Sequence, residues 1–263
     1  MWKDKIALQL YSVRDDMEKD FYGTLQKVRD MGYAAVEFAG LYGNDPAEVK
    51  ALCQKIGLTP LSAHVAYLDL RDDLEKNMDC YAALGCQYIV VPYLLREYRP
   101  GTEAFYDVIR SLPRFAEAAK ERGMILQYHN HAFEFVQLED QYALDLLFET
   151  VGPQLLQTQL DTCWIKIAGE EPTEYLRKYA DRIPTVHLKD FTFSDENTQT
   201  VMAEKYEFRP LGTGLQDLPA IIATALECGA QWFIVELDHP AMGHTALECA
   251  EISAEYLLNK IDV

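Results

Sequence analysis

The segment Thr185–Asp190 carries residues that are suited to chemistry and that a buried strand rarely holds. Side chains alternate along a strand, so His187 and Lys189 share one face while Val186 and Leu188 share the other. Burying such groups without partners is unfavourable, by roughly 2–7 kcal/mol for a neutral polar group alone. The shared face is therefore expected to be hydrated, metal-bound or both. The structural alternative is a pair of capped residues at the end of a strand.

The elements around this segment repeat a strand, a helix and a glycine along the chain. Hydrophobic spacing predicts strands at 5–11, 34–38, 58–65, 87–92, 124–129, 155–160, 183–189 and 231–237. Helices are predicted at 18–31, 46–56, 74–84, 102–122, 142–151, 173–179, 215–228 and 245–260. Strands that alternate with helices pair in parallel through right-handed crossovers. The pattern predicts an α/β fold with one domain over 1–263, a (β/α)8 TIM barrel.

A doubly wound sheet is the competing fold. It usually has a glycine-rich phosphate loop after its first strand, and the residues that follow Tyr11 here, Ser-Val-Arg-Asp, contain no glycine. The barrel is therefore preferred.

Composition limits the classes of function. The net charge of −18 argues against nucleic-acid and anionic-membrane partners, which need a basic patch. No stretch approaches the ~18 uninterrupted apolar residues of a membrane span, and the N-terminus lacks the pattern of a signal peptide. Six cysteines without CxxC spacing are typical of free thiols in a reducing compartment. We expect a cytoplasmic protein that acts on a small molecule.

In a TIM barrel the chemistry lies where the strands end at their carboxyl side. The polar residues at those ends are, in strand order, Gln9, Tyr11, Glu37, His64, Gln127, His129, His131, Glu134, Asp161, His187, Lys189, Glu236 and Asp238. A single one is usually a satisfied core residue, but so many at one mouth indicate a functional site. Asp161, His187 and Glu236, with an oxygen or nitrogen ligand from strand five, suit a divalent ion such as Mn²⁺, Zn²⁺, Co²⁺ or Mg²⁺.

Six ordered motifs carry a likeness that covers essentially the whole chain. They are Tyr-His-Asn-His-Ala-Phe-Glu-Phe at 128–135, Leu-Asp-Thr-Cys-Trp at 160–164, Ala-Gly-Glu-Glu-Pro at 168–172, His-Leu-Lys-Asp at 187–190, Leu-Gly-Thr-Gly at 211–214 and Val-Glu-Leu-Asp at 235–238. Together they resemble the xylose isomerase-like TIM-barrel superfamily and, within it, the sugar phosphate isomerase/epimerase branch. Relatives there include tagatose and psicose 3-epimerases, inosose dehydratase, dehydroshikimate dehydratase and endonuclease IV. The last is excluded because Trp164 stands where that enzyme needs a histidine for its zinc cluster.

The resemblance implies four metal ligands, a Glu, an Asp, a His and a Glu from strands five to eight. The last three fall on Asp161, His187 and Glu236, but Gln127 stands where the first glutamate is expected. Either the Gln127 amide oxygen coordinates the ion or Glu134 reaches back from the loop, and Glu134 is preferred.

Dehydratase-like relatives have a histidine two residues after that glutamate and a lysine after the histidine of strand seven. These positions match His129 and Lys189. The resemblance thus implies His129 as the base and Lys189 as an electrophilic contact. Glu134 and Glu236 would be ligands close to the transferred proton.

The function expected is that of a metal-dependent isomerase or epimerase of a keto sugar or cyclitol, working through an enediolate, with manganese among the candidate ions. The alternatives are a lyase of the inosose dehydratase or 3-keto-glycoside-cleaving type and a sugar-binding barrel without catalysis. A homo-oligomer is compatible with this class of barrel. Residues 212–214 offer a possible phosphate cradle, although a tight turn is the commoner role of such a sequence. Contacts with the carbohydrate are expected from Gln9, Tyr11, Glu37, His64, His131, Trp164 and Arg209.

Overall fold

The computed structural model describes residues 1–138, 140–193 and 206–262, and within them the main sheet closes on itself as a barrel of parallel strands. The first four strands are β1 (Ile6–Gln9), β2 (Ala35–Phe38), β3 (Thr59–His64) and β4 (Tyr88–Val91). The other four are β5 (Ile125–His129), β8 (Gln157–Asp161), β9 (Thr185–Leu188) and β12 (Trp232–Val235). Each strand pairs with the next, and β12 returns to pair with β1. The predicted TIM barrel is confirmed.

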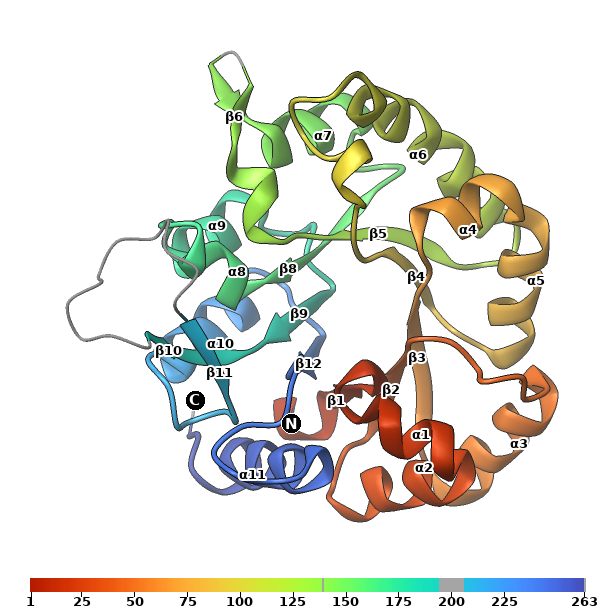
Figure 1. Cartoon of the computed structure of the whole chain (residues 1–263), viewed down its shortest axis with the longest axis vertical. Coiled ribbons are helices and arrows are strands. Elements are labelled where there is room, and N and C mark those ends of the chain that lie inside the picture. The colour runs from red at the N-terminus through yellow and green to blue at the C-terminus, as the bar shows by residue number, and fades with distance from the viewer. Residues whose placement is uncertain (139, 194–205, 263) are drawn as a thin grey trace.

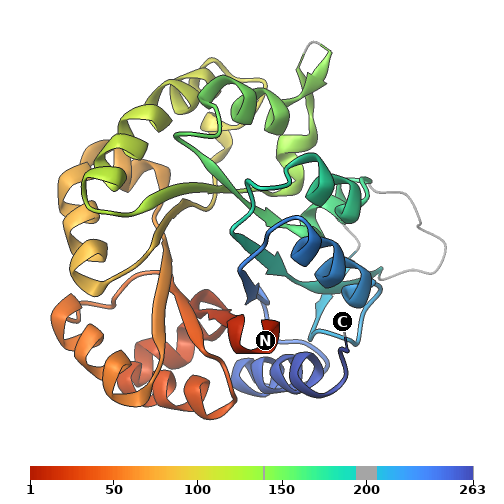
Figure 2. The ribbon, with the colours of Figure 1, turned by 180° about the vertical axis from the view of Figure 1, so that it is seen from behind.

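Helices form a ring around the barrel, and the two opposite views of the chain both show this arrangement (Figures 1 and 2). They are α1 (Arg14–Lys19), α2 (Phe21–Asp30), α3 (Pro46–Ile56), α4 (Tyr67–Asp72), α5 (Leu74–Leu84), α6 (Glu103–Glu121), α7 (Ala143–Val151), α8 (Thr162–Ile167), α9 (Pro172–Lys178), α10 (Leu218–Glu227) and α11 (Ala246–Asn259). The largest hydrophobic cluster packs their inner faces against the outer faces of the strands. In the described ranges no helix is both long and apolar enough to cross a membrane.

The interior of the barrel changes from apolar to polar along the strands. Ala7, Ala35 and Ile234 belong to a small hydrophobic cluster inside the barrel. Two residues further along the same strands stand Gln9, Glu37 and Glu236, because alternate residues share a face. The polar layer therefore lies towards the carboxyl ends of the strands, and the side chains that follow face one another there.

Two parts of the chain differ from the predicted elements near the N-terminus. Strand β1 ends at Gln9 because its side-chain oxygen accepts a hydrogen bond from the Tyr11 backbone N–H at 2.9 Å, and Leu10–Val13 form a 3-10 helix. The helix predicted at 18–31 is divided at Asp20, whose carboxylate caps α2 by accepting from Gly23 N–H.

Short elements outside the barrel also escaped prediction. They are the helices α4 and α8, the 3-10 helices Trp2–Lys5, Arg96–Tyr98 and Ala132–Phe135, and the antiparallel pairs β6 (Gln137–Leu138) with β7 (Gln141–Tyr142) and β10 (Asp190–Phe193) with β11 (Tyr206–Arg209). The six cysteines are free thiols, as the absence of CxxC spacing predicted.

The carboxylate of Asp190 organises the loop after β11. One oxygen accepts from the backbone N–H groups of Gly212 and Gly214, and the other from those of Phe191 and Gln216. Gly214 has to be a glycine, since an added Cβ would lie 2.2 Å from that carboxylate. The backbone donors of residues 212 and 214 are thus already used, so this loop is a turn and not a phosphate cradle.

Candidate metal centre and substrate cavity

Four side chains from separate strands converge at the carboxyl end of the barrel. They are His129 on β5, Asp161 on β8, His187 on β9 and Glu236, which follows β12. Each offers one ligand atom, these atoms all lie within 4.8 Å of one another, and all four residues are buried. The register explains the convergence, because Asp161 lies beside His187, and His187 beside Ile234, in neighbouring strands.

Asp161 presents one carboxylate oxygen to this cluster and uses the other locally. It ends β8 and caps α8, where its Oδ1 accepts from the backbone N–H groups of Cys163 and Trp164. Its Oδ2 is buried without a hydrogen-bond partner, 3.7 Å from His129 Nε2 and 3.4 Å from Lys189 Nζ. A buried oxygen left in this way usually marks the place of a ligand, water or ion.

His187 is held between two carboxylates. Its Nε2 lies 2.7 Å from Glu37 Oε1 and its Nδ1 lies 3.0 Å from Glu236 Oε2. Burial opposes the charged form of the imidazole, but the two carboxylates outweigh it and raise the pKa of His187 to about 9. Glu37 therefore fixes the ring so that Nδ1 faces the cluster.

Glu37 lies directly below the cluster and is completely buried. Its oxygens accept hydrogen bonds from Gln9, Ser62 and Gln159, and Oε1 lies 2.9 Å from His64 Nε2. Burial acts to raise the pKa of Glu37, yet His64 and His187 hold that pKa well below its usual range. The residue is a buried anion surrounded by donors.

Lys189 lies beside the cluster, just after the end of β9, and is 1% exposed. Its Nζ lies 2.9 Å from Glu236 Oε2, 3.4 Å from Asp161 Oδ2 and 3.2 Å from Asp238 Oδ2. Burial acts against the charge, but these carboxylates keep the pKa of Lys189 well above its usual value. The ammonium group orients the carboxylates on which the cluster depends, and its predicted contact with substrate remains a prediction.

The cluster fits a divalent metal ion. Two imidazoles and two carboxylates are the donor set that borderline ions such as Zn²⁺ or Mn²⁺ accept. Asp161 Oδ2 is an acceptor without a partner, and the Glu37 carboxylate fixes a ligating imidazole from behind, as metal sites commonly require. A second group, His64, His129 and His187, also lies within reach of a common point, but it has no carboxylate.

The strand-five member of the cluster is His129, and the structure does not bring Glu134 or Gln127 to it. Glu134 lies in the 3-10 helix after β5, where its oxygens accept from Tyr128 OH at 2.7 Å and His131 N–H at 2.8 Å. Burial raises the pKa of Glu134 to about 8, against the effect of these bonds. Gln127 Nε2 donates to Thr158 O and Thr185 Oγ1 one layer lower. Alternation along the strand could have identified His129 as the member from β5. His129 lies two residues after Gln127 on the same face, as Asp161 lies two residues after Gln159.

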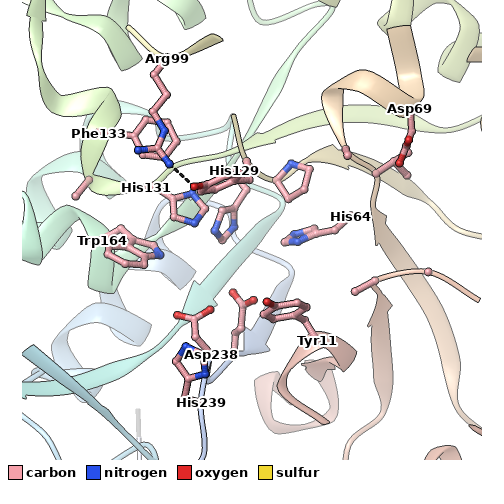
Figure 3. Close-up of a pocket in the computed structure, with 18 of the residues that line it drawn as sticks. Tyr11, His64, Asp69, Arg99, His129, His131, Phe133, Trp164, Asp238 and His239 are labelled. Carbon is pink, nitrogen blue, oxygen red and sulfur yellow. Dashed lines mark hydrogen bonds between the residues drawn. The ribbon is translucent and has the colours of Figure 1, made fainter. Parts of the chain in front are cut away.

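A cavity of about 930 Å³ opens at the cluster, and His129 and Glu236 are among the residues that line it. Figure 3 shows His129 among the other lining side chains. Of the predicted substrate contacts, Tyr11, His64, His131 and Trp164 line this cavity. Gln9 and Glu37 do not, because they are fully buried by the side chains around them. Arg209 does not either, since it lies on β11 and pairs with Glu207 at 2.8 Å. Lining residues that the sequence did not single out for contact with substrate include Asp69, Tyr93, Arg99 and Asp238.

A closed parallel barrel with an imidazole and carboxylate cluster at its carboxyl-end mouth defines a TIM-barrel protein whose site could hold a metal ion. The chain belongs to the xylose isomerase-like TIM barrel family, whose family model matches residues 25–259. It is 28% identical over 266 residues to an inosose dehydratase of Geobacillus kaustophilus, covering 89% of this chain and 85% of that protein.

Solved structures share the fold. A sugar phosphate isomerase/epimerase from Parabacteroides distasonis aligns with a TM-score of 0.78 at 23% identity, covering 96% of this chain and 93% of that one. The IOLI protein, crystallised with a zinc atom, aligns with a TM-score of 0.72 at 18% identity, covering 98% and 99%. The proteins that this chain is similar to thus differ in the reactions that their names state, a dehydration for one and an isomerisation or epimerisation for another.

Proposed function

We propose that this protein is a divalent-metal-dependent carbon–oxygen lyase that acts on a keto sugar or keto cyclitol. The observation that carries the proposal is the pair of imidazoles, His64 and His131, that flanks the four-residue cluster on the cavity side. Their ring centroids lie 5.1 Å and 5.2 Å from that of His129, and Figure 3 shows them on opposite sides of it. An elimination needs one group to remove a proton and another to supply one.

His129, Asp161, His187 and Glu236 would hold the metal ion. When bound, a divalent ion polarises a carbonyl oxygen and makes the neighbouring C–H bond more acidic. Lys189 and Glu37 keep the ligand side chains in place through the contacts with Asp161, Glu236 and His187 described above.

His64 is suited to act as the base. Its Nε2 lies 2.7 Å from Gln159 Oε1 and 2.9 Å from Glu37 Oε1, so the proton of a neutral ring resides there. Nδ1 then carries a lone pair and can accept the proton from carbon. Glu37 is on β2 and Gln159 on β8, so two strands of the barrel together fix the tautomer of His64 with its proton on Nε2.

His131 is suited to act on the opposite side. Its Nδ1 is buried without a hydrogen-bond partner, and burial holds the pKa of His131 well below its usual value. A neutral imidazole can donate a hydrogen bond to the leaving oxygen. The C–O bond then breaks as the proton that His64 took from carbon passes to that oxygen, so that the leaving group departs as water or an alcohol and a C=C bond forms next to the carbonyl group.

One relative by sequence is named for a lyase reaction and supports the proposal. The inosose dehydratase of Geobacillus kaustophilus matches most of this chain, and its name suggests an inosose as the first substrate to test. The IOLI protein with its zinc atom, which shares the fold, supports a divalent metal. The presence of His129 in the cluster in place of a glutamate removes one of the two glutamates expected of an epimerase.

An isomerase or epimerase is the second candidate. The same two imidazoles on opposite sides of His129 could take a proton from one face of a carbon and return it to the other. In that case no leaving group would depart.

The test is incubation of the zinc- or manganese-loaded protein with an inosose and with a keto-hexose in D₂O, followed by mass spectrometry of the products. The lyase predicts metal-dependent loss of one water. Deuterium uptake without loss of mass would establish the isomerase or epimerase instead. Protein that binds the metal and turns over neither compound would favour the sugar-binding barrel. His64→Ala and His131→Ala should each lower kcat by about 10²–10⁴-fold while metal content stays unchanged.

A further inference from the structure

One buried glutamine, Gln159, contacts two of the imidazoles at the site. It lies on β8, where it is the register neighbour of His129 on β5 and of Thr185 on β9. Its Oε1 lies 2.7 Å from His64 Nε2 and 3.2 Å from His129 Nδ1. Its Nε2 donates to Glu37 Oε2 at 2.7 Å and to Thr185 Oγ1 at 3.2 Å. Both N–H groups of the amide and both lone pairs of its oxygen are therefore engaged.

The Glu37 carboxylate fixes which end of the Gln159 amide faces which neighbour. A carboxylate oxygen accepts hydrogen bonds and donates none, so the NH2 end of the amide has to face Glu37. The reversed amide would put its oxygen 2.7 Å from a carboxylate oxygen. The amide oxygen thus faces the imidazoles, and because it can only accept, each ring has to donate to it.

For His129 this places the proton on Nδ1 and the lone pair on Nε2. The hydrogen bond of one ring nitrogen sets the role of the other, and Gln159 Oε1 is the partner of Nδ1 among the described residues. His129 Nε2 lies 3.7 Å from Asp161 Oδ2, which is the buried oxygen without a hydrogen-bond partner. Two acceptor atoms cannot hydrogen-bond to each other, but both can bind the same cation. The tautomer of His129 therefore explains why Asp161 Oδ2 is unpaired although an imidazole lies next to it.

His64 depends less on the glutamine than His129 does. The two ring centroids are 5.1 Å apart, and both rings line the cavity (Figure 3). His64 Nε2 also lies 2.9 Å from Glu37 Oε1, which can accept the same N–H. Without Gln159, the carboxylate would still hold the proton of His64 on Nε2. Loss of the amide should therefore change the tautomer of His129 alone.

We propose that Gln159 is a positioning residue, whose amide oxygen holds the proton of His129 on Nδ1 and so keeps Nε2 available to a metal ion. Without this acceptor, the proton can move to Nε2, where it points towards Asp161 Oδ2 and occupies the ligand position. Only the role of His129 as a ligand rests on the proposed function. The place of its proton is a property of the metal-free protein.

The test reads the tautomers directly. Long-range ¹H–¹⁵N correlation spectra of the metal-free, full-length protein, labelled with ¹⁵N-histidine, show which ring nitrogen carries the proton. His64→Ala and His129→Ala assign the signals of the two rings. We expect the proton on Nδ1 of His129 and on Nε2 of His64.

Gln159→Met keeps the length of the side chain but removes its polar atoms. We expect the proton of His129 to move to Nε2 in this variant, while that of His64 stays on Nε2. Kd for Zn²⁺, measured by isothermal titration calorimetry, should rise by about 10–100-fold, the usual effect of losing a partner behind a ligating histidine. Gln159→Glu retains an acceptor oxygen at this position and should keep the proton of His129 on Nδ1.

Gln127→Met is the matched control. Gln127 is also completely buried inside the barrel and donates to Thr158 O and Thr185 Oγ1, but in the described ranges it makes no hydrogen bond to an imidazole. Its substitution should leave the His129 tautomer and the zinc Kd unchanged. Circular dichroism checks that each variant is folded.

A proton on Nε2 of His129 in the unsubstituted protein would overturn the proposal, and so would a proton that stays on Nδ1 in Gln159→Met. An unchanged zinc Kd in folded Gln159→Met, or the same changes in Gln127→Met, would also overturn it. Should Gln159→Met not fold, the unsubstituted protein and Gln159→Glu still decide. Turnover is measured separately: the expected tautomers and zinc affinities without metal-dependent loss of water would refute only the lyase, whereas loss of water with a His129 tautomer insensitive to Gln159 would refute only the positioning role.

Discussion

At the scale of single residues, the central relation is that of Glu37 to His187. The Glu37 carboxylate is buried with donors around both oxygens and holds the Nε2 edge of the imidazole, so that Nδ1 points to the cluster. Sequence alone suggested that Glu37 touches substrate. The structure places it one layer deeper, where its effect on the reaction has to pass through His187 and His64.

Replacing Glu37 by glutamine keeps the shape of the side chain but removes its charge and one acceptor. We expect Kd for Zn²⁺ to rise by about 10–100-fold, the usual effect of losing a carboxylate behind a ligating histidine. The free energy of unfolding of the metal-free protein should fall by about 3–5 kcal/mol, because His64 and His187 lose their buried partner. Calorimetric titration with zinc and urea denaturation measure the two effects.

Glu149→Gln is the matched control for this variant. Glu149 is exposed on α7, far in the chain from the cluster, so zinc affinity and stability should both stay unchanged. Folded Glu37→Gln protein with unchanged zinc affinity would show that the carboxylate does not position His187.

Substitutions of His129 and of Glu134 should have opposite effects on metal retention. His129→Ala should weaken zinc binding by more than about 100-fold, since ligand loss exceeds the effect of outer-shell changes. Glu134→Gln should retain the ion, because that carboxylate is engaged with Tyr128 OH and the His131 N–H. The zinc content of the two variants after gel filtration, measured by inductively coupled plasma mass spectrometry, distinguishes these outcomes. Loss of zinc from the Glu134 variant alone would restore the assignment made from sequence.

At the scale of elements, the hairpin β10–β11 and the loop after it depend on Asp190. Its four backbone donors, in residues 191, 212, 214 and 216, have this carboxylate as their acceptor. Because Phe208 of β11 lines the cavity, the Asp190 carboxylate also supports one edge of the cavity.

Asp190→Asn replaces one acceptor oxygen by a donor amide that faces N–H groups. We expect the free energy of unfolding to fall by about 2–4 kcal/mol, the cost of leaving buried donors unpaired. Urea denaturation followed by circular dichroism measures the change. Asp262→Asn, exposed near the C-terminus, should have no effect. Equal midpoints for the two variants would mean that the loop is held by other contacts.

The barrel elements were predictable because their signals are local. Apolar strands recur in every unit and glycines end most of the helices, and the order of units alone implies the parallel barrel. The short antiparallel pairs β6–β7 and β10–β11 lack this hydrophobic periodicity. Their strands form through contacts with other parts of the fold, which the local sequence does not report.

The site was predictable only in part, for a similar reason. Asp161, His187 and Glu236 each lie at or just beyond the end of a strand, where the pattern places them. Whether His129 or Glu134 accompanies them depends on where the chain turns after β5, which is set by Tyr128 OH and the His131 N–H. No spacing along the sequence reports those bonds.

At the scale of the whole molecule, the cluster gathers more negative than positive charge. Glu37, Asp161, Glu236 and Asp238 surround Lys189 and the imidazoles in a largely buried region. A divalent cation would balance this excess, so its binding should be coupled to the stability of the barrel.

Adding zinc or manganese to the metal-free protein should therefore raise Tm. An ion at 100 times its Kd contributes about 2.7 kcal/mol, and for a chain of this size that corresponds to roughly 5–10 °C. Differential scanning calorimetry with and without a chelator measures the shift. Asp161→Asn should show no shift under the same conditions, and a similar rise in that variant would place the ion elsewhere.

The seam of the barrel has a consequence for how the protein comes to hold an ion. Strand β12 pairs in parallel with β1, with Ile6 beside Phe233 and Leu8 beside Val235, and Glu236 is the residue after Val235. During synthesis, His129, Asp161 and His187 leave the ribosome before Glu236 does. Glu236 takes its place in the cluster only when β12 pairs with β1. Retention of the metal ion therefore also reports whether the barrel has closed between β12 and β1.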